Sequence, residues 1–400
     1  MKFRKSGRVL LASVVSLGLA IGITACGTSN TIDYLFVTAS SNNNIAVYKV
    51  DSLSGALTQL PNSPFPSGGR NPVAEVTSPD GKFLYVLNHD DNTIVEFGIG
   101  VDGKLYAQNT YNTPGGSPTA LAISPKNDFL FVLDTFQPQN LGTQTGAGAV
   151  IVYPISKGAL GSPVANGTLT YWPVCTSPVA INAVATGATI YVVNKTSVGC
   201  TVNGKVDSAN GSISAFQVGT DGTLSTVAGS PFAAGVTPNA LASDPTAKFL
   251  YVTDGASNQL INFTIQSSGV LVTQPNGPTK TDVLPDAVTV DPRGFYVYVA
   301  NFTGETVNTY NIDLSTGNPT GNTSGATGVG TGPTGVLVEP ALGRFLYTSN
   351  FADNTVSGLQ LNTSTGALIQ TQSSTYKAPG QPTAVAAVTH GNHALQNVQP

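Results

Sequence analysis

A repeated pattern of short strands constrains this chain more than any other feature of its sequence. Each copy has an aromatic residue inside an apolar run, then a polar turn and an alternating strand. The aromatic positions are Phe36, Tyr85, Phe131, Tyr191, Tyr251, Tyr298 and Tyr347, which stand 49, 46, 60, 60, 47 and 49 residues apart. A second marker, Pro-x-Ala or Pro-x-Gly at the start of an apolar run, recurs at Pro72, Pro118, Pro178, Pro238, Pro285, Pro333 and Pro382.

This period and strand pattern predict an all-β fold, a seven-bladed β-propeller, rather than a helical solenoid. Each blade is expected to be a four-stranded antiparallel sheet, with the innermost strand A starting at the Pro marker and strand B holding the aromatic residue. The marker at Pro382 has no aromatic run after it, and residues 34–38 have no marker before them. We therefore expect residues 382–388 to supply strand A to the blade formed by residues 34–60. This would close the ring and remove free sheet edges.

The repeats resemble those of the seven-bladed lactonase-type propellers and the related YVTN-repeat family. The residues that carry the resemblance are Tyr85-Val86-Leu87-Asn88, Tyr191-Val192-Val193-Asn194, Tyr251-Val252-Thr253-Asp254, Tyr298-Val299-Ala300-Asn301 and the turn Ser78-Pro79-Asp80-Gly81. The resemblance covers nearly all of the chain after residue 32, and its relatives include enzymes similar to 6-phosphogluconolactonase and carboxymuconate cyclase. It implies a fold more strongly than an activity, because one propeller scaffold carries many functions.

The N-terminal 25 residues are predicted to be a signal peptide. A basic segment ending at Arg8 precedes an apolar run over residues 9–23, which is short for a membrane span. The following Ile23-Thr24-Ala25-Cys26 resembles the bacterial lipobox, which implies lipidation of Cys26 and a membrane anchor in the cell envelope. Gly27 after the Cys favours the outer membrane where the organism has one. The alternative is an ordinary secretory signal that contains a Cys.

Removal of residues 1–25 leaves a short linker, residues 26–32, and a propeller over residues 33–400. The leader carries four basic residues and no acidic ones, so the mature charge is (17 − 4) − 21 = −8. An acidic protein of this kind is a poor partner for nucleic acid. We expect a monomer with no cofactor and no metal, since the Asn- and Asp-rich stretches at residues 42–44 and 89–92 are ordinary tight-turn sequences.

Two repeats are longer than the others, and their extra residues are expected in loops. The additions are residues 135–148 in blade 3 and residues 195–211 in blade 4. Both lie between strands B and C, on the rim where propellers usually bind ligands. Trp172 and Lys195 are predicted to belong to this binding rim, although Trp172 is equally compatible with a packed loop anchor.

Blade 4 holds the two remaining cysteines, Cys175 just before strand A and Cys200 just after strand B. Because strands A and B are antiparallel neighbours, both residues belong to the same rim. An exported protein keeps its disulfides, so we predict a Cys175–Cys200 bond that fixes the long loop. Two separate thiols are the alternative.

Rim residues decide whether the chain has lactonase activity. In lactonase-type relatives, strand A often reads Pro-Arg-His and strand B ends in Asn-Glu. Here the Arg position holds Val73, Thr119, Val179, Asn239, Asp286, Thr334 and Thr383, and the His position holds only Ala or Gly. One residue departs from the apolar pattern, because Glu75 takes a strand A position that is Leu, Ile or Val in the other blades. With Arg70 and His89 nearby in sequence, it is a candidate catalytic acid or base, or one half of an ion pair with Arg70.

Two functions from different classes therefore remain open. The first is a membrane-anchored, non-catalytic propeller that binds a protein, a glycan or a small molecule at its rim. The second is a lactone hydrolase in which Glu75 and His89 activate water.

Overall fold

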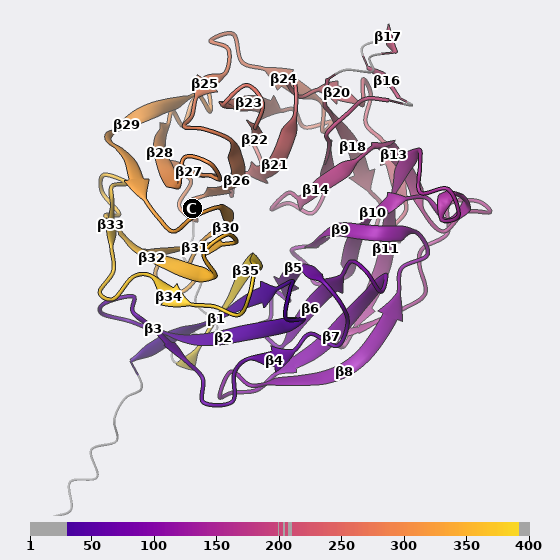
Figure 1. Cartoon of the computed structure of the whole chain (residues 1–400). Helices are drawn as coiled ribbons and strands as arrows, with labels where there is room; N and C mark the ends of the chain where they lie inside the picture. The colour runs from indigo at the N-terminus through magenta and orange to yellow at the C-terminus, as the bar shows by residue number, and fades with distance from the viewer. Residues whose placement is uncertain (1–29, 199, 203–204, 207–209, 392–400) are drawn as a thin grey trace, which may run out of the picture.

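The computed structural model describes residues 30–198, 200–202, 205–206 and 210–391. These residues form seven antiparallel sheets around a central axis, which is a seven-bladed propeller as the repeats predict (Figure 1). The blades are numbered in chain order, and the strands of each blade are called A to D from the axis outward. The B–C and D–A connections emerge on one face, the upper rim. The A–B and C–D turns form the opposite, lower face.

Strand A lines the axis in every blade. From blade 1 to blade 7 it is β35 (Pro382–Thr389), β5 (Pro72–Thr77), β9 (Gly116–Ile123), β14 (Pro178–Ala183), β21 (Pro238–Ser243), β26 (Pro285–Val290) and β30 (Pro333–Val338). Strand B is β1 (Thr31–Ala39), β6 (Phe83–Asn88), β10 (Phe129–Phe136), β15 (Thr189–Asn194), β22 (Phe249–Asp254), β27 (Tyr296–Asn301) and β31 (Phe345–Asn350).

Strand C follows the B–C turn. It is β2 (Asn44–Asp51), β7 (Thr93–Ile99), β11 (Ala147–Ser156), β18 (Ser212–Val218), β23 (Gln259–Ile265), β28 (Thr306–Ile312) and β32 (Thr355–Leu361). The outermost strand D is continuous in blade 2 as β8 (Leu105–Asn112) and in blade 6 as β29 (Pro319–Gly328). In the other blades it is split into β3 (Leu57–Gln59) and β4 (Phe65–Pro66), β12 (Ala159–Leu160) and β13 (Trp172–Thr176), β19 (Leu224–Thr226) and β20 (Phe232–Ala233), β24 (Leu271–Thr273) and β25 (Thr279–Lys280), and β33 (Leu368–Gln370) and β34 (Tyr376–Lys377).

The two ends of the described chain complete blade 1, as expected from the unmatched repeats. Strand β35 pairs antiparallel with β1 from Asp33↔Thr389 to Ala39↔Pro382, so the yellow and indigo ends of the chain lie side by side in Figure 1. Strand β1 begins at Thr31, inside the segment predicted to be a linker, because Thr31 already pairs with Asp51 of β2. Among the described residues no helix is long and apolar enough to cross a membrane.

The repeated Tyr of strand B is explained by a bond to the next blade. The Tyr85 hydroxyl is buried and donates to the Gly158 carbonyl at 2.6 Å, and Gly158 sits in the C–D turn of blade 3 at a φ of 92° that favours glycine. Four other blades repeat this bond, as Tyr191 to Gly269, Tyr251 to Gly317, Tyr298 to Gly366 and Tyr347 to Gly55. A buried hydroxyl needs a partner, so in these five blades the Tyr joins the blade to its successor. In blades 1 and 3 the position is Phe36 and Phe131, which carry no hydroxyl.

Most of the core lies between neighbouring blades. One cluster, for example, combines Phe36 and Val47 of blade 1 with Leu84 and Val86 of blade 2, and all four are fully buried. Burial of apolar area is worth roughly 25 cal/mol per Å², so each blade depends on its neighbours for most of its stability.

The two extra segments lie at the upper rim. In blade 3, β10 and β11 extend into the predicted loop and leave residues 137–146, which include the short 3-10 helix η1 (Pro138–Asn140). In blade 4 the segment carries a small hairpin of β16 (Thr201–Val202) and β17 (Lys205–Val206).

Candidate functional site

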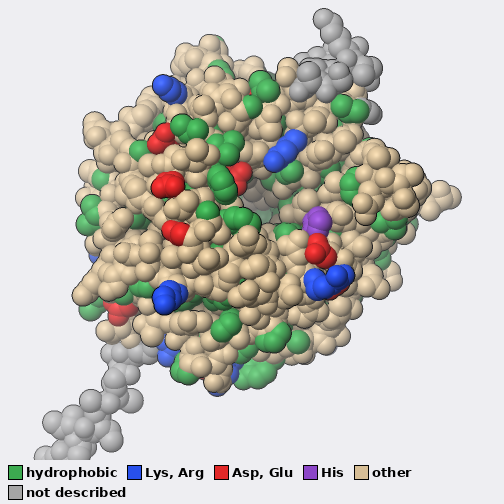
Figure 2. Space-filling model, in the orientation of Figure 1, with side chains coloured by type: hydrophobic (Ala, Val, Ile, Leu, Met, Phe, Trp, Pro, Cys, Tyr) green, Lys and Arg blue, Asp and Glu red, His purple; other side chains and the backbone are tan. Residues whose placement is uncertain are grey.

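A cavity of about 710 Å³ occupies the centre of the ring and forms the candidate site, here called the central cavity. Its wall is built from strand A residues, chiefly the second to fourth positions of the strands in blades 1, 4, 5, 6 and 7. Lys195 and Phe351 enter from the upper ends of strands B. A hollow at the middle of the ring is visible in Figure 2, with basic, acidic and His side chains around it.

The residue after the Pro marker of strand A, here called the second position, mostly links neighbouring blades by hydrogen bonds. The Thr119 hydroxyl donates to the Pro178 carbonyl of the next blade at 3.1 Å, and Asn239 donates to Pro285 at 3.1 Å. The pattern recurs from Thr334 to Pro382 at 3.2 Å and from Thr383 to Pro72 at 2.9 Å. These four polar side chains therefore support the wall and are already bonded to it.

Asp286 takes this same position in blade 6 but cannot make the same bond when ionised, because a carboxylate only accepts hydrogen bonds. No described residue hydrogen-bonds its carboxyl group. Burial raises the pKa of Asp286 to about 6, and the positive charge of Lys195 offsets part of that effect. Both residues line the central cavity, yet no direct ion pair joins them. The cavity thus carries one carboxyl group, of Asp286, and one ammonium group, of Lys195, and neither has a direct partner among the described residues.

Glu75 lies beside the cavity rather than in its mouth. It is 9% exposed, and no group of the described residues lies within normal hydrogen-bond geometry of its carboxyl oxygens. Burial raises the pKa of Glu75 well above its usual range, and the backbone N–H groups of Thr38 and Ala386 in blade 1, which approach it without reaching that geometry, lower it only in part. Because these N–H groups belong to β1 and β35, the Glu75 carboxyl group is directed toward the neighbouring blade.

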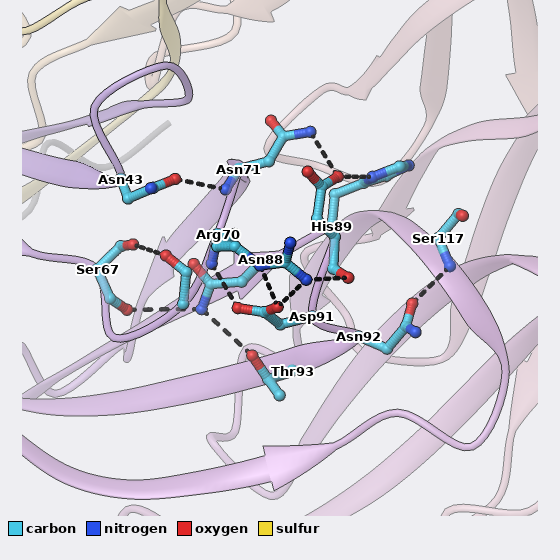
Figure 3. A network of polar contacts seen from close by, with 12 residues as sticks. Asn43, Ser67, Arg70, Asn71, Asn88, His89, Asp91, Asn92, Thr93 and Ser117 are labelled. Atoms are coloured by element: carbon cyan, nitrogen blue, oxygen red, sulfur yellow. Dashed lines mark hydrogen bonds and ion pairs between the residues drawn. The ribbon is translucent and has the colours of Figure 1, made fainter.

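Arg70 and His89 are not brought together with Glu75. The Arg70 side chain donates to Asp91, with an ion pair of 2.6 Å, and His89 Nδ1 lies 2.8 Å from the Asp90 carboxylate (Figure 3). The Arg70 guanidinium holds the pKa of Asp91 below its usual range. The predicted Arg70–Glu75 ion pair is therefore wrong, because a closer carboxylate in the B–C turn takes the guanidinium.

The Asn-rich B–C turns near Arg70 and His89 connect neighbouring blades. Asn43 accepts a bond from the Asn71 backbone N–H of the next blade at 2.7 Å, and Asn92 accepts one from Ser117 at 2.7 Å (Figure 3). Both Asn residues sit at positive φ, a conformation that Asn tolerates better than most residues. Their side-chain oxygens are thus occupied by neighbouring blades.

The predicted disulfide is present. Cys175 and Cys200 are bonded, with their Cα atoms 5.5 Å apart, and the bond ties the long B–C segment of blade 4 to the end of β13. Lys195 belongs to the same segment. The disulfide therefore fixes the loop that follows the cavity lysine.

Trp172 does not belong to a binding surface, so this part of the rim prediction is wrong. Strand β13 pairs with β11, and Trp172 is 5% exposed in the core between blades 3 and 4, together with Phe131 and Phe216. It is the packed anchor that the sequence also allowed. A D–A connection expected to be a loop instead continues the sheet and buries the indole.

Asp286 is the residue that sequence reasoning missed. The lactonase pattern predicts a basic Arg at this position, so from the sequence Asp286 counts only as a departure from that pattern. A signal was nevertheless available, because Asp286 is the single ionisable residue among the seven second positions of strand A.

Comparison with known proteins agrees with this architecture. The sequence matches the family described as "Lactonase, 7-bladed beta-propeller" over residues 28–137 and 181–338. The chain belongs to this lactonase propeller family. No curated protein sequence matches the chain.

Solved structures of similar fold include two bacterial proteins with lactonase names. A proposed 6-phosphogluconolactonase of Bacteroides uniformis shares 18% identity at a TM-score of 0.70, over 90% of this chain and 100% of that one. The periplasmic gluconolactonase of Pseudomonas aeruginosa shares 17% identity at a TM-score of 0.71, over 90% and 99% of the two chains. At such identities the similarity establishes the fold alone.

Proposed function

We propose that this lactonase-family propeller is an exported lipoprotein that binds a small polyhydroxylated molecule in its central cavity. The observation that carries the proposal is the pair of oppositely charged groups, Lys195 and Asp286, which line one cavity without a direct partner. A hydroxylated ligand can accept a hydrogen bond from the ammonium group and donate one to the carboxylate. The volume of about 710 Å³ suits a small molecule.

Calorimetric titration of residues 27–400 with sugars, aldonates and sugar lactones tests this binding. Lys195→Met and Asp286→Asn are each expected to weaken the best ligand at least about tenfold, the typical loss when a charge-assisted hydrogen bond is removed. Lys280→Met, a change of an exposed lysine in β25 outside the cavity wall, is the matched control. Unchanged affinity in both cavity variants would overturn the assignment.

Lactone hydrolysis is the second candidate, favoured by family membership together with the Asp286 pKa of about 6. In that reaction the Asp286 carboxylate accepts a proton from water as the water oxygen attacks the lactone carbonyl. The Lys195 ammonium stabilises the oxyanion. When the ring C–O bond breaks, the proton held by Asp286 passes to the leaving ring oxygen, which yields the hydroxy acid and restores the carboxylate.

Turnover of sugar lactones separates hydrolysis from binding alone. If the protein is a hydrolase, its rate rises with pH through about 6 as Asp286 ionises, and Asp286→Asn lowers the rate by about 10²-fold or more. Glu75→Gln serves as the comparison, because that carboxyl group lies between blades. Binding without turnover leaves the protein as a binding protein, and loss of turnover only in Glu75→Gln would move the chemistry away from Asp286.

The anchoring part of the proposal rests on the lipobox at Cys26, which lies outside the described residues. In the native host, Cys26→Ser is expected to release the protein from the membrane fraction or leave it unprocessed. Unchanged lipid labelling of that variant would contradict the anchor.

A further inference from the structure

The chain enters the propeller at the lower face, beside the C–D turns of blades 1 and 2. Strand β1 starts at Thr31, and the Asn30 carbonyl accepts a hydrogen bond from Ser52 N at 2.7 Å. Ser52 belongs to the C–D turn of blade 1. On the other side of β1, the Tyr34 hydroxyl donates to the Val101 carbonyl in the C–D turn of blade 2 at 3.3 Å. Two turns therefore flank the entry point.

Each of these turns presents an apolar side chain to solvent. Leu53 is 73% exposed and Val101 is 90% exposed, the latter being the largest exposure among the large apolar residues of the described chain. The turns are well ordered by their own bonds, since the Asp51 carboxylate accepts from Leu53 N at 3.1 Å and from Ser54 N at 2.8 Å. In blade 2, Gly103 N donates to the Gly100 carbonyl at 2.8 Å. Rigid turns thus hold both side chains away from the core.

Corresponding turns on the other side of the ring are polar at their tips. Blade 4 has Thr220 and Asp221 there, and blade 5 has Ser267 and Ser268. Blade 6 has one exposed apolar residue in this turn, Leu314, but blade 6 does not adjoin blade 1. Among the C–D turns of the described residues, those of blades 1 and 2 therefore combine an exposed apolar side chain with a hydrogen bond to the start of the described chain.

Covalent geometry limits how far this face can lie from a lipid on Cys26. Four residue steps separate Cys26 from Asn30, and a fully extended chain covers at most about 3.5 Å per residue, so the tether spans no more than about 14 Å. The bilayer is then the surface that Leu53 and Val101 meet first.

We propose that the lower edge of blades 1 and 2 rests on the bilayer, with Leu53 and Val101 inserted at the headgroup boundary. This inference rests on the lipidation of Cys26 in the proposed function. Two basic residues of the lower-face turns of blade 2 are paired within those turns, Lys104 with Asp102 at 2.6 Å and Lys82 with Asp80 at 3.4 Å. The proposed contact is made by the two apolar side chains, so zwitterionic lipids are sufficient for it. The upper rim, with Lys195, faces away from the membrane.

Tryptophan placed at the two turns reports the contact. Leu53→Trp and Val101→Trp are made in the full lipidated protein and reconstituted with phosphatidylcholine vesicles whose acyl chains carry bromine, a short-range quencher. We expect each new Trp to lose about half of its emission relative to unbrominated vesicles, because side chains at this boundary reach about 5–10 Å into the lipid. Trp172 is only 5% exposed and adds a constant background.

Thr220→Trp, on the C–D turn of blade 4, is the matched control and is expected to keep its emission. Unquenched Trp at both 53 and 101 in protein that floats with the vesicles would overturn the docking surface, as would equal quenching at 220. If the protein does not float, lipidation has failed instead. Coupling Cys26, the one cysteine outside the disulfide, to a maleimide lipid then restores the tether and gives the same test of the surface.

Discussion

Blade 1 and blade 4 are both fastened by links between separate segments, but the two links differ in kind. Blade 1 joins β1 to β35, the first and last strands of the described chain, through hydrogen bonds and apolar packing alone. Blade 4 joins Cys175 to Cys200, which stand 25 residues apart, through a covalent bond at the upper rim.

The strength of a link therefore does not determine how much of the fold depends on it. The weak bonds of blade 1 close the whole ring. Their loss exposes sheet edges and the apolar cores that blade 1 shares with its two neighbouring blades. The strong bond of blade 4 restrains one rim segment, and the four strands of that blade pair without it. We expect disruption of blade 1 to affect the entire fold and disruption of blade 4 to affect mainly the rim.

Removal of residues 380–400 breaks the link in blade 1 and has the largest expected effect. It deletes β35, exposes the inner edge of β1 and uncovers apolar surface on two blades, a loss of several kcal/mol or more at roughly 25 cal/mol per Å². That is comparable with the whole stability of many domains. We expect aggregation or a large fall in Tm by calorimetry. Removal of residues 392–400 is the control, and a melt unchanged by the longer deletion would mean that the ring closes by another route.

Replacement of Cys175 and Cys200 by Ser breaks the link in blade 4. The loop-entropy model gives about 3 kcal/mol for closure of a loop of this length, with the loss concentrated in the rim. We expect a smaller fall in Tm than for the deletion, together with weaker ligand binding through Lys195. Thiol counting on the unfolded, unreduced wild-type protein should find neither cysteine free. A double variant as unstable as the deletion would erase the distinction between the two blades.

Two acidic side chains are buried between blade 1 and blade 7, beside the strand pair that closes the ring. Asp33 and Glu339 are both 0% exposed, and burial followed by their mutual proximity raises the pKa of Asp33 well above its usual range. Burial also raises the pKa of Glu339. Groups with raised folded-state pKa values stabilise the fold at low pH, and this contribution is lost as pH rises above the usual carboxyl range.

The free energy of unfolding of the wild-type protein should therefore fall between mildly acidic and mildly alkaline solution. In Asp33→Asn this fall should be smaller, by an amount on the order of 1–3 kcal/mol. Denaturant unfolding at several pH values measures it. Asp353→Asn, at an exposed residue of the B–C turn of blade 7, is the control. A wild-type protein whose stability rises over this pH range would contradict the raised pKa values.

Arg70→Ala is expected to have the smallest effect. Its ion pair with Asp91 is exposed and screened by water, so Tm should stay within experimental error. A clear loss of ligand binding in this variant, with Tm unchanged, would extend the candidate site from the central cavity to the rim of blade 2.

The sequence was sufficient for the fold because the repeated aromatic residues and Pro markers recur in register. The unmatched Pro382 even identified the closing strand. Side-chain direction was harder, because the repeat places Glu75 on strand A but does not show that its carboxyl group approaches the backbone of blade 1. The burial of Trp172 was not predictable from the sequence either, because it depends on the pairing of β13 with β11, which is set by tertiary contacts. Asp286 stands out as a candidate site residue only in the folded chain, where Lys195 lines the same cavity.

The Tyr–Gly bonds between blades have a consequence for the order in which the protein can mature. As the chain is made, Tyr85, Tyr191, Tyr251 and Tyr298 each find their glycine carbonyl only after the following repeat has emerged. Tyr347 reverses this order, because its partner Gly55 lies 292 residues earlier in the chain. The first blade also lacks its innermost strand until β35 arrives. Synthesis therefore proceeds blade by blade, but the native state is reached only when the last repeat returns to the first.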